Sequence, residues 1–355
     1  MISPSLTRRK ALAGLVSFLG AGVAAKLAGL PPLEAAEPAA AADGVDHSKP
    51  GHLTPGSQHA GFAQGGRVDP AANGFDPSEM VRDFDWGRTQ ELSGGRVLRE
   101  WDLVAVDKEI EVAPGVKFAA WTYNGRVPGP TLRCREGELL RIHFRNGGSH
   151  PHTIHFHGIH TAAMDGVPGV GEEAGGGLIE PGESFTYEFD AEPFGLHHYH
   201  CHTTPLSTHI AKGLYGAFII DPKQGRPEAD ELVLVQNGFD TNFDMGNEVY
   251  AVNTVGFHYL YEPIRVKRGD LVRIYLSNML EFDQINSFHL HGNFFHYYPT
   301  GTSLEPAELT DTIMQAQGQR GILELRFPYT GKYMFHAHKT EFAELGWMGF
   351  FEVEG

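Results

Sequence analysis

The chain repeats itself, and this internal repeat constrains the fold more than any other feature of the sequence. Three stretches return later in the chain: "PTLRCREGELLRIHFRN" at 130–146 as "PIRVKRGDLVRIYLSN" at 263–278, "HTIHFHG" at 152–158 as "NSFHLHG" at 286–292, and "HYHCH" at 198–202 as "YMFHAH" at 333–338. The repeated unit is about 130 residues long and consists of short apolar runs separated by turns. The sequence therefore predicts two similar β-sandwiches in tandem. The 44 glycines and 22 prolines agree with a turn-rich β architecture.

Four His-x-His pairs lie at matching positions of the two repeats. In a strand, residues i and i+2 point to the same face about 6.5–7 Å apart. That distance is wide for one ion and fits two neighbouring ions. Four pairs that meet would provide eight imidazoles, enough to hold three metal ions as three, three and two, with water or hydroxide completing the last. The pairs are His155/His157, His200/His202, His289/His291 and His336/His338.

Cys201 stands between two of these histidines and would point to the opposite face of the same strand. A thiolate with two imidazoles and a weak axial position is the blue-copper arrangement for electron transfer. His209, eight residues later, and His152 are the imidazoles that the pattern offers. The second repeat lacks this site, because Ala337 and Asn286 stand at the positions of Cys201 and His152.

Taken together, these blocks resemble the multicopper oxidases. The resemblance covers about residues 95–355 and rests on "YNGRVPGPTLRCREGE", "HTIHFHG", "HYHCHTTPLSTHIAKGLYG", "SFHLHG" and "FHAH". It implies an all-β fold of two tandem cupredoxin-like Greek-key β-sandwiches, over residues 95–225 and 226–355. It further implies a two-domain laccase-type oxidase with the blue copper in the first domain, similar in layout to copper nitrite reductases.

The resemblance gives the blue-copper, or type 1, ligands as His152, Cys201 and His209. Leu214, five residues after His209, takes the axial position. An apolar residue there removes a weak donor to copper, which should raise the reduction potential. The spacing from the cysteine to the second histidine is longer than in three-domain laccases and close to that in nitrite reductases.

The remaining histidines are implied to form a trinuclear copper cluster. His155 and His289, the first members of their pairs, resemble type 2 ligands. The chain would then hold four copper ions: one type 1, one type 2 and two type 3. The residues that resemble type 3 ligands are His157, His200, His202, His291, His336 and His338.

Reduction of dioxygen to water consumes protons, so such a cluster needs an acid nearby. Asp165, in "MDGVPG", matches an acidic position beside the trinuclear site of similar oxidases. The alternative is a plain turn aspartate before glycine. Glu341, just past the last histidine pair, is a second candidate acid, and it could equally be a surface charge at the end of a strand.

The resemblance also implies partners. Dioxygen would be the electron acceptor and a phenol or aromatic amine the one-electron donor, although a small redox protein could also deliver electrons. Similar two-domain proteins usually form homotrimers with trinuclear clusters at the subunit interfaces. The sequence leaves open whether the histidine pairs meet within or between chains. The net charge of −16 argues against a nucleic-acid partner.

The N-terminal part is predicted to lie outside the two domains. Residues 1–42 resemble a twin-arginine signal peptide, because Arg8 and Arg9 precede a mildly apolar run broken by Lys26. This predicts export to the periplasm or the medium, and a membrane anchor is the alternative. Residues 43–94 are rich in Gly, Pro, Asp and His and are predicted to form an extended arm with a short helix around "DPSEMVRDF".

Two other functions compete with the oxidase. A copper nitrite reductase needs one type 2 copper held by three histidines, and it leaves the complete set of four pairs unexplained. A non-catalytic electron carrier needs only Cys201, His152 and His209. Copper content per chain separates the three: four ions for the oxidase, two for the reductase and one for the carrier.

Overall fold

The first repeat forms two β-sheets. In the computed structural model, which describes residues 66–170 and 177–355, one sheet contains, in order, β1 (Phe84–Asp85), β5 (Thr131–Arg135), β10 (Tyr215–Asp221), β9 (Gly195–His200) and β7 (His155–Phe156). The other contains β2 (Arg88–Glu91), β3 (Val97–Ala113), β6 (Leu139–Asn146) and β8 (Ser184–Asp190), with β4 (Val116–Tyr123) paired to β3.

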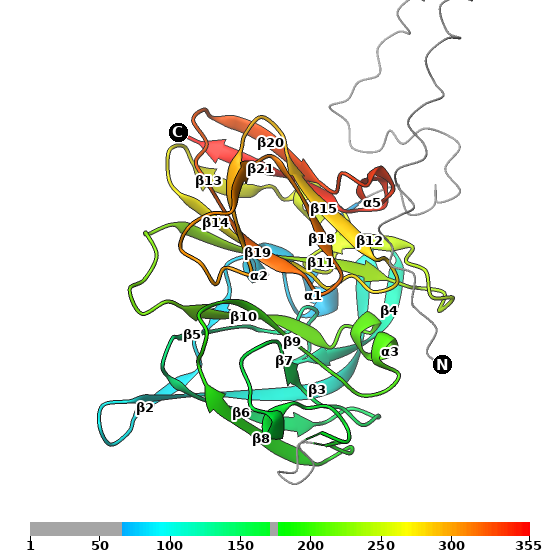
Figure 1. Ribbon diagram of the computed structural model, residues 1–355. Helices are drawn as coiled ribbons and strands as arrows, with labels where there is room; N and C mark the ends of the chain where they lie inside the picture. Colours follow the sequence, from blue (N-terminus) through cyan, green and yellow to red (C-terminus); the bar gives the residue numbers. More distant parts are fainter. Residues whose placement is uncertain (1–65, 171–176) are drawn as a thin grey trace, which may run out of the picture. The chain divides into compact units, whose positions relative to one another are not determined.

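The second repeat forms two further sheets. One contains, in order, β12 (Val249–Val252), β11 (Asp230–Phe239), β14 (Val272–Asn278), β19 (Arg320–Leu325), β16 (Phe295–Pro299) and β17 (Glu308–Thr310). The other contains β13 (Ile264–Lys267), β21 (Met348–Glu354), β20 (Gly331–His336), β15 (Ile285–Leu290) and β18 (Thr312–Ala316). Figure 1 shows β3, β6 and β8 in one group of strands and β13, β20 and β21 in another.

Equivalent strands of the two repeats pair in the same way, which confirms the repeat seen in the sequence. β5 runs parallel to β10 as β13 runs parallel to β21, and β9 and β20 each pair antiparallel with those partners. The histidine strands repeat the register as well, because His155 lies opposite His200 and His289 opposite His336. The same turn precedes β6 and β14, with Gly137 at φ 89° and Gly269 at φ 84°, a conformation that favours glycine.

The apolar runs of the sequence form the cores. β6 alternates between buried and partly exposed residues, as a strand with one face in a core should. β14 is buried along its whole length, because a further hydrophobic cluster lies between the two sandwiches. Phe118, Phe239 and Tyr275 belong to that interface cluster. The fold is thus nearly all β, as predicted.

The helices are short and lie between strands. They are α1 (Pro70–Asn73), α2 (Pro77–Met80), the 3-10 turn η1 (Ala162–Met164), α3 (Leu206–Ala211), α4 (His258–Tyr261) and α5 (Thr340–Glu344). Asp69 and Asp76 cap α1 and α2 with side-chain oxygens, and a proline opens each helix. In the part of the chain that the structure describes, no helix has the length and apolar character needed to cross a bilayer.

Residues 66–94, predicted as part of an extended arm, pack on both sandwiches. Strand β1 pairs with β5 of the first sandwich, while Val81 is buried in the core of the second. The predicted short helix is present as α2, and its Pro77 carbonyl accepts a hydrogen bond from Tyr259. The predicted signal peptide, residues 1–42, lies outside the described residues.

A buried ion-pair network joins the two sandwiches. Arg133 of β5 bonds both Asp221 of β10, at 2.8 Å, and Glu231 of β11, at 2.6 Å. Glu231 also accepts from Arg273 at 2.9 Å, and Arg273 pairs with Glu324 at 2.6 Å. We call these five residues the interdomain network.

Candidate metal centre

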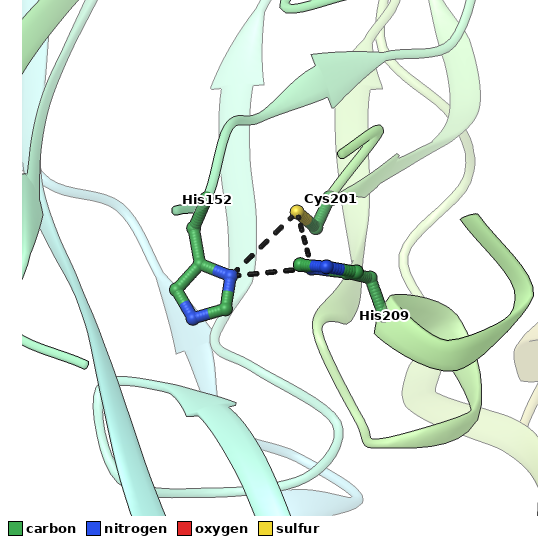
Figure 2. A group of neighbouring side chains, drawn as sticks. All are labelled: His152, Cys201 and His209. Atoms are coloured by element: carbon green, nitrogen blue, oxygen red, sulfur yellow. Dashed lines mark hydrogen bonds between the residues drawn. The ribbon is translucent and has the colours of Figure 1, made fainter. Parts of the chain in front are cut away.

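Cys201 follows the last residue of strand β9, and two imidazoles lie beside its sulfur (Figure 2). The Sγ atom is 3.2 Å from Nδ1 of His209 and 3.9 Å from Nδ1 of His152, and these two nitrogens are 3.2 Å apart. His209 lies on helix α3, and His152 lies shortly before β7. The structure thus brings together the three residues that the sequence predicts as one site.

The chemistry of this Cys–His–His group fits a copper ion. Burial raises the pKa of the Cys201 thiol and lowers the pKa of each imidazole to about 4. The imidazoles are therefore neutral at neutral pH, with lone pairs available to a cation. Nδ1 is the His152 nitrogen that lies near the sulfur, while Nε2 is buried without a hydrogen-bond partner among the described residues. A thiolate with two imidazoles suits copper, and a bound cation would keep the sulfur deprotonated.

The backbone around the sulfur is ordered by hydrogen bonds. The Thr153 N–H donates to Sγ of Cys201 at 3.4 Å. The Cys201 N–H donates to the carbonyl of Leu214 at 3.0 Å, and the Leu214 side chain is fully buried in the same core cluster. Leu214, predicted as the axial residue, therefore lies beside the site, and its side chain has no atom that could donate to a metal.

The first histidine set comprises His155, His157, His200 and His202. Its rings crowd around His155, whose centroid is 5.2 Å from that of His157 and 5.3 Å from those of His200 and His202. Nε2 of His157 lies 2.8 Å from Nε2 of His200. His200 has its Nδ1 against the carbonyl of Cys201, which leaves the Nε2 lone pair facing another imidazole. A cation between such nitrogens would satisfy both.

The second histidine set comprises His289, His291, His336 and His338, and its geometry repeats that of the first. The His289 centroid is 5.0 Å from His291, 5.3 Å from His336 and 5.2 Å from His338. Nε2 of His291 lies 3.0 Å from Nε2 of His336. All four predicted His-x-His pairs are thus present, as two groups of histidines with equivalent geometry.

In each set, the Nδ1 atom of one histidine is hydrogen-bonded to a residue outside the set. Nδ1 of His155 donates to Asp165, whose Oδ1 lies at 2.8 Å and whose backbone oxygen lies at 2.9 Å. Nδ1 of His289 donates to the Asp311 carbonyl at 3.0 Å and to Oγ1 of Thr312 at 2.8 Å. Such outer bonds fix the ring and the tautomer of a metal-binding imidazole, so the arrangement fits ligation through Nε2.

The two predicted acids have different surroundings. Asp165 touches the first histidine set directly, and its Oδ1 is also 3.4 Å from Nε2 of His160. Glu341 is exposed at the start of α5 and lies 3.8 Å from Lys339. Within the described ranges Glu341 belongs to no group of metal-ligating side chains.

The two histidine sets are separate. Within residues 66–170 and 177–355, no group of neighbouring metal-ligating side chains mixes members of the two sets. The first set lines a cleft of about 580 Å³, whose lining also includes Glu281 and Gln317 from the second sandwich of the same chain. The second set lies at the surface, where His291 and His338 are exposed.

Several residues around the site escaped the sequence prediction. Asp311 binds His289 through its backbone carbonyl, whereas Asp165 binds His155 through its carboxylate as well, and the separations along the chain are 22 and 10 residues. Strands β16 and β17 fill the longer interval, so matching the repeats does not align the two aspartates. Glu281 could have been suspected only from the loop that precedes the second histidine strand, and its place in the cleft depends on the tertiary fold.

Comparisons with known proteins agree with this geometry. A family model described as multicopper oxidase matches residues 105–225, and another of the same description matches residues 227–355. A crystal structure of a multicopper oxidase superposes with a TM-score of 0.79 at 66% identity, covering 81% of this chain and 100% of that one.

More distant relatives include both oxidases and reductases. A blue copper oxidase from Nitrosomonas europaea superposes with a TM-score of 0.65 at 29% identity, covering 72% of this chain and 86% of that one. The copper-containing nitrite reductase of Neisseria gonorrhoeae is 32% identical over 275 residues, which are 71% of this chain and 68% of the reductase.

Proposed function

Because this chain belongs to the multicopper oxidase family, we propose that it is a two-domain laccase-type oxidase with cupredoxin-like domains at 95–225 and 226–355. It would oxidise a phenol or aromatic amine by one electron at a time and reduce dioxygen by four electrons to water. The observation that carries this proposal is the second histidine set, which is as complete as the first and equivalent to it in geometry. A reductase with a three-histidine copper site has no use for four imidazoles in each domain.

The proposed ligands follow the donor chemistry of the three groups. Cys201, His152 and His209 would hold one type 1 copper, with Leu214 at the axial position. His155 and His289 would hold one type 2 copper, and the other six members of the two histidine sets would hold two type 3 coppers. When bound, these four ions would supply the one-electron redox chemistry and the affinity for dioxygen that no side chain offers.

The chain's own residues connect and orient these sites. Cys201 lies between His200 and His202, so the backbone links the sulfur to two members of the first histidine set. Asp165 fixes the ring of His155 through a hydrogen bond from its carboxylate, which supports a role in proton supply. Glu341, exposed and paired with Lys339, remains a weaker candidate.

The separation of the two sets supports a cluster shared between chains. We propose a homotrimer in which the first set of one chain meets the second set of its neighbour. The second set lies near exposed apolar side chains, with Phe294 56% and Met314 66% exposed, as expected for a surface that another subunit covers. Met314 lies on β18, which pairs with the strand that carries His289.

Copper content and acceptor choice test the function. The purified protein should contain four copper ions per chain, consume dioxygen with a phenolic donor, and produce water without accumulating peroxide. Two coppers per chain with reduction of nitrite would instead support the reductase. That alternative is favoured by the 32% identity to the Neisseria gonorrhoeae enzyme.

Mixed trimers test the shared cluster. We would coexpress two inactive variants, His157→Ala in the first set and His291→Ala in the second. In a mixed trimer at least one interface joins an intact first set to an intact second set, so part of the oxygen consumption should return. Mixed trimers that sediment normally but consume no oxygen would exclude a cluster shared between chains. This result would not contradict the proposed copper ligands.

We also propose export by the twin-arginine route to the periplasm or the medium. The support is the pair Arg8 and Arg9 ahead of an interrupted apolar run.

A further inference from the structure

The Cys201 site has no direct access to solvent. Cys201 and His152 are 0% exposed, and His209 is 3% exposed. An electron donor outside the protein therefore cannot touch the sulfur and barely reaches the edge of one imidazole. Because electron transfer slows steeply with distance, the group that lies between the ligands and the surface decides how fast electrons arrive.

Trp121, on strand β4, occupies that position. Its ring centroid is 4.7 Å from that of His209 and 5.2 Å from that of His152. The ring centroid of the same indole also lies 4.7 Å from that of His150, which is exposed. Trp121 itself is only partly buried. The indole thus contacts both imidazoles of the site and an aromatic ring at the surface.

The fold holds the indole in this position from two sides. The backbone N–H of Trp121 donates to the backbone carbonyl of Lys212 at 2.9 Å, and Lys212 caps helix α3, which carries His209. On its other edge β4 pairs with β3, with Trp121 opposite Asp107. The Lys212 ammonium donates to the Ala119 carbonyl at 2.9 Å and lies 5.9 Å from the indole centroid. Trp121 and His209 therefore keep a fixed separation.

The Lys212 ammonium near the indole also makes oxidation of the indole less favourable. A positive charge near an aromatic ring opposes removal of an electron from it, because the resulting radical cation would face a like charge. The indole is therefore suited to conduct an electron without holding the oxidising charge itself.

We propose that Trp121 is the contact through which the electron donor delivers electrons to the Cys201 copper site. This rests on the proposed function, since it requires a type 1 copper there. In each step the donor would lose one electron, which would reduce a Cu(II) ion held by Cys201, His152 and His209 to Cu(I), and the indole would be unchanged. The geometry favours a planar aromatic donor, whose ring can approach the exposed His150 and the edge of Trp121.

The test compares Trp121→Leu with Trp121→Phe, and uses Trp86→Phe as the matched control. Trp86 is 38% exposed and stacks on Arg99 and Arg133, away from the histidines. Under anaerobic conditions, a phenolic donor is mixed with oxidised protein and the loss of the blue absorption is followed. Trp121→Leu should reduce the second-order rate constant about tenfold, equal to about 1.4 kcal/mol in activation free energy. Trp121→Phe, which keeps a smaller ring, should reduce it about threefold, and the control should match the wild type.

A second measurement does not depend on turnover. Copper added to the apoprotein should quench tryptophan emission, and Trp121→Phe should lose most of that quenching because Trp121 is the indole in contact with the site. Reoxidation of the fully reduced protein by dioxygen should stay at the wild-type rate in all variants. A wild-type protein that fails this reoxidation would refute the proposed function, while the reduction rates would still test Trp121.

A Trp121→Leu protein that keeps its blue band and is reduced at the wild-type rate would overturn the proposal. If the Trp121→Leu variant loses its blue band, the reduction rate of the Trp121→Phe variant tests the proposal instead. A slower reduction with a normal band supports the proposal, and an unchanged rate refutes it.

Discussion

Replacing Glu231 by glutamine should weaken the joint between the two sandwiches. The Glu231 carboxylate accepts hydrogen bonds from Arg133 at 2.6 and 3.0 Å, from Arg273 at 2.9 Å and from Tyr275 at 2.8 Å. The amide keeps the shape of the side chain but loses the charge. With its oxygen at the position of Oε1, its nitrogen takes the position of Oε2 and becomes a donor that faces the Arg133 guanidinium.

The size of the effect follows from the burial of the partners. Breaking a buried ion pair by removing one partner costs roughly 3–5 kcal/mol. Here each arginine retains a second carboxylate, Asp221 or Glu324, and the Glu231 side chain is 20% exposed. We therefore expect a loss of about 2–3 kcal/mol in the free energy of unfolding, or about 4–6 °C in melting temperature.

The dependence on pH has a definite sign. Burial alone would raise the pKa of Glu231, but hydrogen bonds and charge from Arg133, with help from Tyr275 and Arg273, hold it below its ordinary value of 4.5. A carboxyl group with a depressed pKa contributes stability above its unfolded pKa and loses it as the pH falls through the folded value. The difference between wild type and Glu231→Gln should therefore be full at neutral pH and shrink below about pH 4.5.

Thermal unfolding of the apoprotein, followed by circular dichroism from pH 3 to pH 8, measures this difference. Glu188→Gln is the matched control, because its pair with Arg141 is exposed, at 42% and 32%, and should contribute less than about 1 kcal/mol. If Glu231→Gln melts no lower than the control at neutral pH, the interdomain network does not stabilise the protein and this reasoning fails.

Three further predictions concern the copper sites and export. Cys201→Ser should abolish the blue absorption and donor oxidation while leaving the trinuclear copper in place; a variant that stays blue would point to Cys134. Leu214→Met should add a weak thioether donor and lower the type 1 potential in a redox titration, and an unchanged potential and spectrum would mean that another residue is axial. Replacing Arg8 and Arg9 by lysine should leave precursor in the cytoplasm, as detected by fractionation, and normal export would exclude the twin-arginine route.

Much of the site could be predicted because its cysteine and histidines lie in short sequence motifs whose spacing sets the direction of each side chain. The alternation of a strand is enough to set Cys201 on the face opposite His200 and His202, and the structure has that arrangement. The repeat was enough to predict equivalent histidine sets, since Asn146 and Asn278 end equivalent strands.

What the sequence could not predict depends on contacts between distant segments. Trp121 gives no pattern of its own, and its contacts with His152 and His209 follow from the way β4 packs beside helix α3. Arg133 is one of several arginines in its strand region, and only the fold brings it to Glu231 across the domain boundary. Residues 66–94 lack periodicity, so their packing on both sandwiches had no signature in the sequence.

The position of the two histidine sets has a consequence for a single chain on its own. If the clusters form between chains, a lone chain carries a complete blue-copper site but only half of each cluster. It could accept electrons yet could not pass them to dioxygen, and so would release no partly reduced oxygen before assembly. Dilution below the dissociation constant of the trimer should then remove oxygen consumption while the blue colour persists.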